Sequence, residues 1–372
     1  MPGNEMTQEN PMKSLIEDLQ AHLTEKEHTD IIFSDGNSKT FPIIPENFVE
    51  IKEIPNPRKI AFVDGGDGIL EESPNYMIVI NRAYFSIFSG KKRIYPVNLK
   101  RRIEFFSYVV SEISNTGNGK TISYNTKLFA YNKKDEEYFP EIDDLKSKTE
   151  GTTILQGSRL VSLARRFAEW KLAYKIVESE LSKGDMIVMD GSLQTNFKNE
   201  IKYAKKLYET AMQKGVIVCG LAKTSRLVTE SGDPLLARIT EISESTNFGR
   251  WYIPVAEEVS ADDKGFMLAT KFHPKSRHVF RFEIIREQFN SMTSDEKNEI
   301  MASLVANSGD ISMLGYPYGA IDADRFAQVR MNELGKYRGM LLAEKTKDRI
   351  WKRLSKYTLT NEVHEDLNWV TS

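Results

Sequence analysis

The amino-acid sequence predicts an α/β protein in which a mixed sheet is covered by helices. Short apolar runs such as 60–63 are typical of buried strands. The stretch 158–181 is typical of a long amphipathic helix with one apolar stripe. Because strands alternate with helices after a start of three strands, the pattern favours a mixed sheet with helices on its faces.

The first 57 residues form a separate N-terminal segment in this interpretation. A polar, disordered start is expected to lead into a short amphipathic helix before residue 28, since apolar side chains recur at helical spacing. This stripe packs either on the protein's own core or on a partner, so the segment is a candidate docking region. The stripe consists of Leu15, Ile16, Leu19 and Leu23.

The core is expected at 58–335. Its first strands, at 59–64, 76–80 and 83–88, are predicted to form a meander. Residues 115–155 are rich in turn residues and then in charge, and are predicted to be a solvated insertion rather than an acidic binding segment.

The later elements follow the alternation. The apolar stripe of the helix at 158–181 consists of Leu160, Leu163, Ala164, Phe167, Ala168, Leu172, Ile176 and Val177. Further strands are expected at 185–190, 215–220, 251–255, 265–270 and 278–285, and further helices at 197–213, 294–306 and 320–335. A basic helical tail at 346–356, in a C-terminal region 336–372, is expected to end the fold.

The composition excludes several kinds of site. A chain of 372 residues corresponds to about two domains, or to one large domain with insertions. The single cysteine, Cys219, excludes an intrachain disulfide and a Cys-rich zinc site, and its apolar strand predicts a core residue.

The net charge of −2 does not by itself indicate nucleic-acid binding. Without an apolar leader or a membrane-length apolar run, the expected location is the cytoplasm.

Two predicted strands close on an aspartate followed by glycine, at Asp64 and Asp190. An ionised carboxylate is not tolerated in an apolar core, so each should lie at the edge of the sheet or bind a ligand. The glycine lets the backbone turn or a ligand approach. On neighbouring strands the two carboxylates would repel each other unless a divalent cation neutralised them. The competing interpretation is two ordinary Asp-Gly turns.

Two later acids are further candidates, each with a structural explanation. Glu169 lies one turn after Arg165 and Arg166, so helical ion pairs are expected, although alone it is typical of a solvated surface residue. Asp322 is a candidate cap for the helix that follows it, near 320–335. Asp324 would then lie in the first turn, where the helix dipole favours an anion.

Taken in order, these features resemble the NurA nuclease family. The features are the strand end at Asp64, the helical Glu169, Asp-Gly-Ser-Leu at 190–193, Gly-x-x-Lys at 220–223 and Tyr-Pro…Ala-Asp at 316–324. The resemblance spans about 58–335. It implies a ribonuclease-H-like core, a homodimer with a central channel, manganese-dependent DNA exonuclease activity and a HerA-type hexameric ATPase as partner.

Carried over by position, the resemblance implies four catalytic metal ligands: Asp64, Glu169, Asp190 and Asp324. The first motif reads Asp-Gly-Gly where relatives have Asp-Gly-Ser, and Asp324 stands where relatives often carry histidine. Carboxylate oxygens suit Mn²⁺ and Mg²⁺. Two such ions about 3.5–4 Å apart, bridged by Asp64, can activate water and stabilise the leaving oxygen.

Three side chains are candidates for binding phosphate or DNA: Lys223, Arg165 and Tyr316. Lys223 follows a buried strand and can meet a phosphate as a point charge, although a solvated strand end explains it equally well. Tyr316 either donates to a phosphate oxygen or packs in the core. Basic stretches would add sequence-independent contacts; they lie at 100–102, 198–206, 271–281 and 349–356.

The leading hypothesis is a metal-dependent DNA exonuclease for DNA-end processing. The sequence has no Gly-x-x-x-x-Gly-Lys loop, so an ATP-driven motor must be another protein. One alternative is another metal-dependent phosphodiesterase on the same core, such as an RNase or a flap nuclease. The other is a catalytically silent subunit that binds DNA or the ATPase, and the intact set of acids argues against it.

Overall fold

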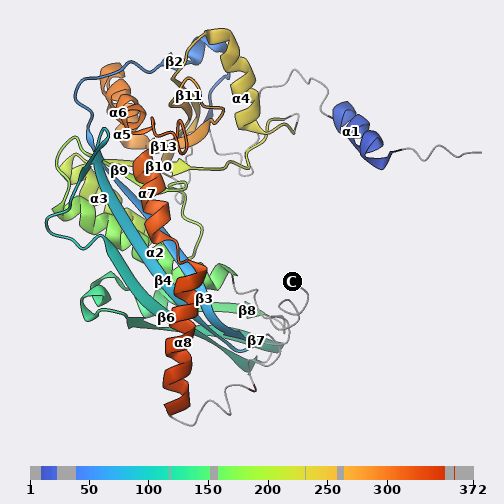
Figure 1. Ribbon diagram of the computed structural model, residues 1–372, viewed down its shortest axis with the longest axis vertical. Coiled ribbons are helices and arrows are strands. Elements are labelled where there is room, and N and C mark those ends of the chain that lie inside the picture. The colour runs from blue at the N-terminus through green and yellow to red at the C-terminus, as the bar shows by residue number, and fades with distance from the viewer. Residues whose placement is uncertain are drawn as a thin grey trace, which may run out of the picture.

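The computed structural model describes residues 10–22, 39–116, 119–150, 158–230, 232–257, 264–347 and 356. Figure 1 shows an elongated body built on one long sheet, with helices on both sides of it and α1 (Pro11–His22) lying apart.

A single sheet of thirteen strands runs through the described part of the chain. The strand order is β1-β11-β12-β13-β10-β9-β3-β4-β6-β7-β8, with β2 beside β11 and β5 beside β4. The strands are β1 (Lys39–Thr40), β2 (Val49–Glu50), β3 (Lys59–Ser73), β4 (Tyr76–Ser89), β5 (Lys92–Ile94), β6 (Arg102–Thr116), β7 (Gly119–Ala130), β8 (Ser147–Glu150), β9 (Met186–Asp190), β10 (Ile217–Ala222), β11 (Trp251–Glu257), β12 (Gly265–Lys271) and β13 (Phe280–Ile285).

The centre of this sheet has a ribonuclease-H-like arrangement. β3, β4 and β6 form an antiparallel meander, whereas β9 runs parallel to β3 and β10 runs parallel to β9. Helix α2 (Ser158–Ser179) precedes β9, and α3 (Glu200–Lys214) lies between β9 and β10. The expected mixed α/β sheet flanked by helices is therefore confirmed.

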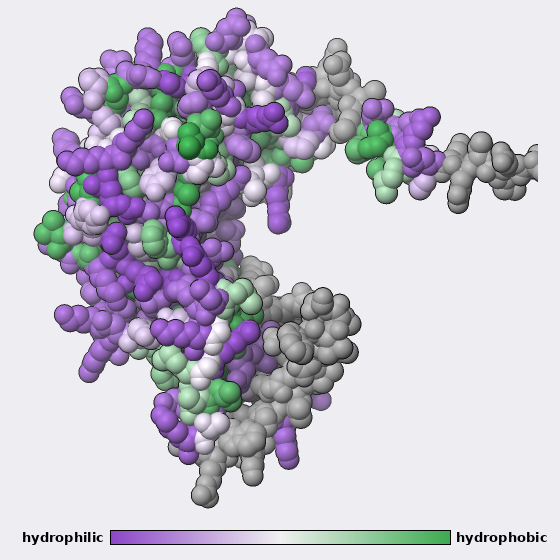
Figure 2. Space-filling view, in the orientation of Figure 1, coloured by the Kyte–Doolittle hydropathy of each residue, from purple (hydrophilic) through white to green (hydrophobic). Residues whose placement is uncertain are grey.

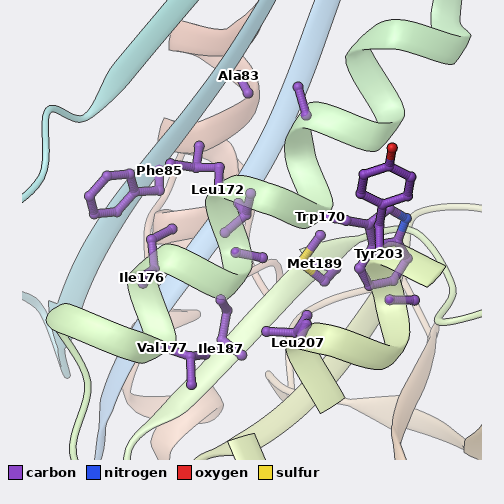
Figure 3. Close-up of a cluster of buried hydrophobic side chains, with 14 of the residues drawn as sticks. Ala83, Phe85, Trp170, Leu172, Ile176, Val177, Ile187, Met189, Tyr203 and Leu207 are labelled. Carbon is purple, nitrogen blue, oxygen red and sulfur yellow. The ribbon is translucent and has the colours of Figure 1, made fainter. Parts of the chain in front are cut away.

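Each face of the central sheet has its own apolar core. One core joins α2 and α3 to the sheet, and Figure 3 shows its side chains, with Trp170 and Leu172 from α2 and Leu207 from α3. All eight residues of the stripe predicted on α2 are buried. The other core joins the sheet to α6 (Ser294–Asn307) and α7 (Tyr318–Ala327). The remaining helices are α4 (Leu235–Ser243), α5 (Arg286–Ser291), α8 (Met331–Lys347) and the short 3₁₀ turns η1 (Pro45–Asn47), η2 (Lys133–Tyr138), η3 (Ile142–Leu145) and η4 (Glu244–Thr246).

The strands expected at 76–80 and 83–88 are one continuous strand, β4. The polar pair that separates the two apolar runs, Asn81 and Arg82, is buried without breaking the strand, because each side chain has a partner on β6. Asn81 Nδ2 donates to Ser107 Oγ at 2.9 Å, and Arg82 Nε donates to Glu104 Oε1 at 2.8 Å. Paired charges of this kind are tolerated inside a sheet.

The solvated insertion expected at 115–155 is wrong for the residues that the structure describes. β6 and β7 form a long antiparallel hairpin, and β8 adds a further strand at its edge. Ile122 and Tyr124 alternate toward the interior, while Tyr138 and Leu145 anchor η2 and η3 in the core. Alternation with polar residues is typical of a half-buried strand, and the charge of this segment concealed it.

The helix expected at 320–335 is two helices, α7 and α8, separated at residues 328–330. Gln328 is the C-terminal cap of α7, and its carbonyl oxygen accepts from Arg82 Nη1 at 2.8 Å. Val329 then packs against Leu70 and Ile80. The buried arginine and this apolar contact redirect the chain, and neither is visible as a local helix signal.

The packed body begins before the boundary expected at residue 57, since β1 and β2 pair with β11 and Phe48 is buried. In α1, by contrast, the apolar stripe is exposed and no described residue covers it. Leu15, Ile16 and Leu19 are 57%, 48% and 48% exposed, and Leu23 lies outside the described residues.

Cys219, the C-terminal tail and the character of the described helices can also be compared with the sequence predictions. Cys219 is a buried core residue of β10, and burial raises the pKa of its thiol. The expected tail at 346–356 is described only to Lys347 and at Lys356, so most of it lies outside the described residues. Of the helices described, none has the length and apolar character that a membrane crossing requires.

Candidate active site

Asp64 and Asp190 lie at equivalent positions on neighbouring parallel strands. β3 and β9 are paired as far as Val63 and Met189, and the two aspartates are the next residues. β9 ends at Asp190, as expected, and Gly191 follows with a φ of 93°. β3 does not end at Asp64 but continues to Ser73 against β4, so the first Asp-Gly pair is not a turn. What ends at Asp64 is the pairing with β9, which leaves an open edge there.

The carboxylates of Asp64, Asp190 and Asp324 gather around one ammonium group. Lys223 directly follows β10, and its Nζ lies 2.6 Å from Asp324 Oδ1, 3.3 Å from Asp190 Oδ1 and 3.9 Å from Asp64 Oδ2. Three predicted ligands and one predicted phosphate-binding residue therefore meet at the carboxyl ends of β9 and β10. This is the edge of an open α/β sheet at which ligands bind.

Asp324 reaches this centre from α7, in a position different from the expected one. The helix begins at Tyr318 after Pro317, so Asp322 is not its cap and Asp324 is not in its first turn. Asp322 is instead buried and paired with Arg93. The helix lies close to the sheet because Gly319 has no side chain, and a Cβ there would overlap the ring of Phe62. The helix-dipole explanation for Asp324 is therefore wrong.

Glu169 approaches the same strand from the opposite face of the sheet. It is 3% exposed, so the solvated alternative is wrong, and its carboxylate lies over Gly65, where a Cβ would overlap it. Arg165 and Arg166 both pair with this carboxylate. Glycine at position 65 thus makes room for an acid one residue beyond Asp64.

Two acids missed by the sequence reasoning hold these arginines. Arg165 Nε donates to Asp67 Oδ2 at 2.7 Å, so its guanidinium bridges Asp67 and Glu169. Arg166 Nε donates at 2.8 Å to Glu200 Oε1, which also accepts from Trp170 Nε1 at 2.7 Å. Glu200 is fully buried and looked like a helical surface residue in the sequence. For Asp67 the sequence did contain a local signal of a site residue, because a glycine follows it as one follows Asp64.

Burial and like charge make ionisation of this centre costly. The pKa of Asp64 is raised to about 8, first by burial and then by the charges of Asp190 and Glu169. Lys223 and the Gly65 amide, which donates to Asp64 Oδ1 at 2.6 Å, oppose that rise. Burial also raises the pKa of Asp190. Burial alone would lower the pKa of Lys223, but Asp190, Asp324 and Asp64 raise it above its ordinary value.

Tyr316 packs in the core beneath this centre. It is 2% exposed, and its hydroxyl has no hydrogen-bond partner among the described residues. A cavity of about 10 Å³, lined by Tyr316, Asp64 and Asp190, lies beside it. Such a volume has room for about one water molecule. Contact between the Tyr316 hydroxyl and a phosphate oxygen remains a prediction.

The donor chemistry of the centre suits a hard cation, since every predicted ligand offers carboxylate oxygens and their like charges are crowded. Within the described ranges, no group of three or more His, Cys, Asp or Glu side chains is arranged to hold a metal ion as it stands. Lys223 supplies the positive charge among Asp64, Asp190 and Asp324. A bound cation would therefore take over a role that this ammonium now has.

Comparisons with known proteins identify a family for this chain. A family model described as "NurA domain" matches residues 58–329, which include all four predicted ligands. No curated protein matches the chain. Among solved structures, the chain is similar to the "Crystal structure of Aa-Ago with externally-bound siRNA", with a TM-score of 0.28 and 10% identity over 75% of this chain. The chain spans 28% of that protein, a similarity too low to bear on function.

Proposed function

The chain belongs to the NurA family of nucleases, and from this premise we propose that it is a metal-dependent DNA nuclease, an exonuclease that processes DNA ends. One observation carries the proposal. Asp64, Asp190 and Asp324 converge on Lys223 at the carboxyl edge of the sheet, with Glu169 close by across Gly65. A phosphodiester is an anion, so a centre that collects carboxylates needs added positive charge before it can bind one.

Mn²⁺ or Mg²⁺ would supply this added positive charge. Two ions held by Asp64, Glu169, Asp190 and Asp324 would activate the attacking water and stabilise the leaving oxygen. Asp64 would lose its proton on loading, because a nearby cation lowers a pKa that burial and the neighbouring acids raise to about 8. Lys223, freed from the three carboxylates, would hold a phosphate oxygen as a point charge. Arg165 and Arg166 would keep the Glu169 carboxylate in place.

We also propose a homodimer and a HerA-type hexameric ATPase as partner. The resemblance to this family implies both, and any ATP-driven motor must be another protein, since the sequence has no phosphate-binding loop for ATP. The exposed apolar stripe on α1 supports docking, because no described residue of the chain covers it. A single mass near 85 kDa, twice the chain's 42.6 kDa, is expected from light scattering.

The test is a nuclease assay with end-labelled linear DNA, circular DNA, RNA and a flap substrate. Linear DNA should be degraded with Mn²⁺, more slowly with Mg²⁺ and not at all in EDTA, while circular DNA persists. Asp190→Asn should abolish degradation. Asp185→Asn is the matched control, because Asp185 immediately precedes the other end of β9 and pairs with Lys59 at 3.0 Å. Degradation in EDTA would exclude the metal-dependent mechanism. Degradation of RNA but not DNA would mean that the protein is a nuclease with a different substrate.

A further inference from the structure

An aromatic and basic surface lies on the far flank of α7 from the acidic centre. Tyr84 is paired in register with Asp64 across β3 and β4, so this surface begins one strand away from the proposed site. Phe326 of α7 stacks on Tyr84 with ring centroids 5.3 Å apart and planes 29° apart. Phe326 is nevertheless 44% exposed, so one part of its ring faces solvent.

Arginine and a second aromatic ring continue this surface. Arg101 Nη1 donates to the Tyr84 hydroxyl at 3.5 Å, and the Arg101 guanidinium lies 5.3 Å from the ring centre of Tyr95. Tyr95 is 67% exposed. Among the described residues Arg101 forms no ion pair, so its charge is not neutralised by a neighbouring carboxylate. Phe326, Tyr84, Arg101 and Tyr95 thus form a continuous chain of contacts, called the aromatic platform below, in which Tyr84 is buried at 4% exposure and the rings of Phe326 and Tyr95 are exposed.

Three consecutive residues of α7 connect the acidic centre to this platform. Successive helical residues are about 100° apart around the axis. Ala323 and Ala327 are buried against the sheet, which places Asp324 on one flank, Arg325 outward and Phe326 on the other flank. Asp324 contacts Lys223, Arg325 is exposed, and Phe326 contacts Tyr84. A chain that leaves the centre over α7 therefore meets a positive charge and then an aromatic face.

The view in Figure 2 has α7 and α8 toward the reader and shows a mostly hydrophilic face broken by small apolar patches. Isolated apolar residues on such a face need no partner. Exposed rings beside arginines that form no ion pair among the described residues differ, because a base can stack on the ring while its phosphate meets the guanidinium. Bases in a duplex are already stacked on one another and are not free to do this.

We infer that the aromatic platform is a subsite for single-stranded DNA, which crosses α7 at Arg325 and stacks its bases on Phe326 and Tyr95. This inference rests on the proposed nuclease function and adds a binding subsite outside the acidic centre. Stacking on an aromatic ring does not depend on base identity, so the subsite should accept any sequence. It would hold the nucleotides next to the bond that is cut and so set the register of the strand.

The test compares two fluorescent 20-mers of equal charge, oligothymidylate and an abasic strand, by anisotropy in EDTA. The full-length protein should bind oligothymidylate more tightly. Phe326→Ala and Tyr95→Ala should each weaken that binding by about five- to thirty-fold while leaving the abasic strand unchanged. Phe326→Trp, which keeps a stacking face, should retain the preference. Arg101→Gln should weaken both strands and reduce the salt dependence by about one phosphate contact. Met212→Ala, at a 49% exposed residue of α3, is the control.

Three other results would contradict either the inference or the proposed function. If the wild-type protein binds both strands equally, or if the alanine variants keep the preference, the platform does not stack bases and the inference is wrong. If the variants instead change the mass measured by light scattering, the surface is a protein interface and the inference is equally wrong. If the wild-type protein binds no DNA and also fails to degrade it, the proposed function itself is lost, which separates the two failures.

Discussion

At the scale of single residues, the centre is governed by a shortage of positive charge. One ammonium, that of Lys223, is shared by Asp64, Asp190 and Asp324. The 7% exposed Asp64 has the least access to solvent of these three acids and the strongly raised pKa. Its protonation state is therefore the most direct report on whether a cation has entered the site.

Asp64→Asn should stabilise the metal-free protein at alkaline pH. The pKa of Asp64 is about 8 when folded and near 3.8 when unfolded, so between these values the folded state holds a proton that the unfolded state has released. The wild-type free energy of unfolding therefore falls as pH rises from about 4 to 8, and asparagine removes this contribution. In EDTA at pH 8.5 the variant should melt about 5–10 °C higher, with convergence near pH 4.

Differential scanning fluorimetry at pH 4, 6, 7 and 8.5 measures this effect. Asp185→Asn is again the control, because Asp185 is a strand-flanking acid outside the centre and should keep the wild-type pH dependence. Equal pH slopes for the wild-type protein and Asp64→Asn would show that Asp64 is not protonated at neutral pH. Added Mn²⁺ should narrow the difference by stabilising only the protein that keeps its carboxylate.

At the scale of elements, three helices pack closely on one glycine-rich stretch of β3. A Cβ at Gly65 would overlap Glu169 of α2, one at Gly66 would overlap the Ala327 carbonyl of α7, and one at Gly68 would overlap Leu334 of α8. Successive residues of a strand point to opposite faces, so α2 packs on one side and α7 and α8 on the other. The absent side chains thus let acids from both faces approach the same edge.

Gly65→Ala should therefore impair the site more than the fold. The added methyl group overlaps the Glu169 carboxylate, which two arginines hold, so the side chain has to move and its pairs with Arg165 and Arg166 are strained. We expect a loss of about 1–3 kcal/mol of stability and at least about ten-fold slower cleavage. Chemical denaturation and single-turnover kinetics measure the two effects.

Gly335→Ala provides the matched substitution. Gly335 lies in α8, and a Cβ there meets no atom within 4 Å. Replacing glycine by alanine inside a helix should raise stability by up to about 1 kcal/mol and leave cleavage unchanged. A Gly65→Ala enzyme as active as the Gly335→Ala enzyme would mean that Glu169 has no role in the reaction.

At the scale of the whole molecule, α1 is the described element without packing on the body (Figure 1). No described residue of the protein's own core covers its apolar stripe, and docking of the stripe on a partner stays a prediction. An amphipathic helix of this kind docks into a groove through side chains at helical spacing. We keep the HerA-type ATPase as the proposed partner.

Replacing Leu15 and Leu19 together with serine should separate docking from catalysis. The variant should stay dimeric, melt within about 1 °C of wild type and degrade single strands normally, because neither residue packs on the body. ATP-stimulated digestion of long duplex DNA with the cognate motor should be lost. Normal stimulation would place the docking surface elsewhere, and a large drop in melting temperature would mean that the stripe packs within the protein or its dimer.

Local patterns in the sequence were sufficient to predict much of this molecule. The apolar runs that became β3, β9 and β10, the stripe of α2 and the core position of Cys219 are confirmed, because each depends on periodicity within one element. The family was also accessible from ordered motifs, since the family model covers 58–329. The position of Asp190 at the end of its strand followed from the same local signals.

Only the tertiary structure decided how these pieces meet. Asn81 and Arg82 lie within a strand because β6 and α8 supply their partners, and 320–335 is broken because Arg82 holds the Gln328 carbonyl. Glu200 is buried because Arg166 and Trp170 lie beside it. A polar residue is stable inside a protein only when its partners are present, and those partners are distant in the sequence. Periodicity therefore predicts which face is apolar, whereas long-range hydrogen bonds and ion pairs decide which charges are buried.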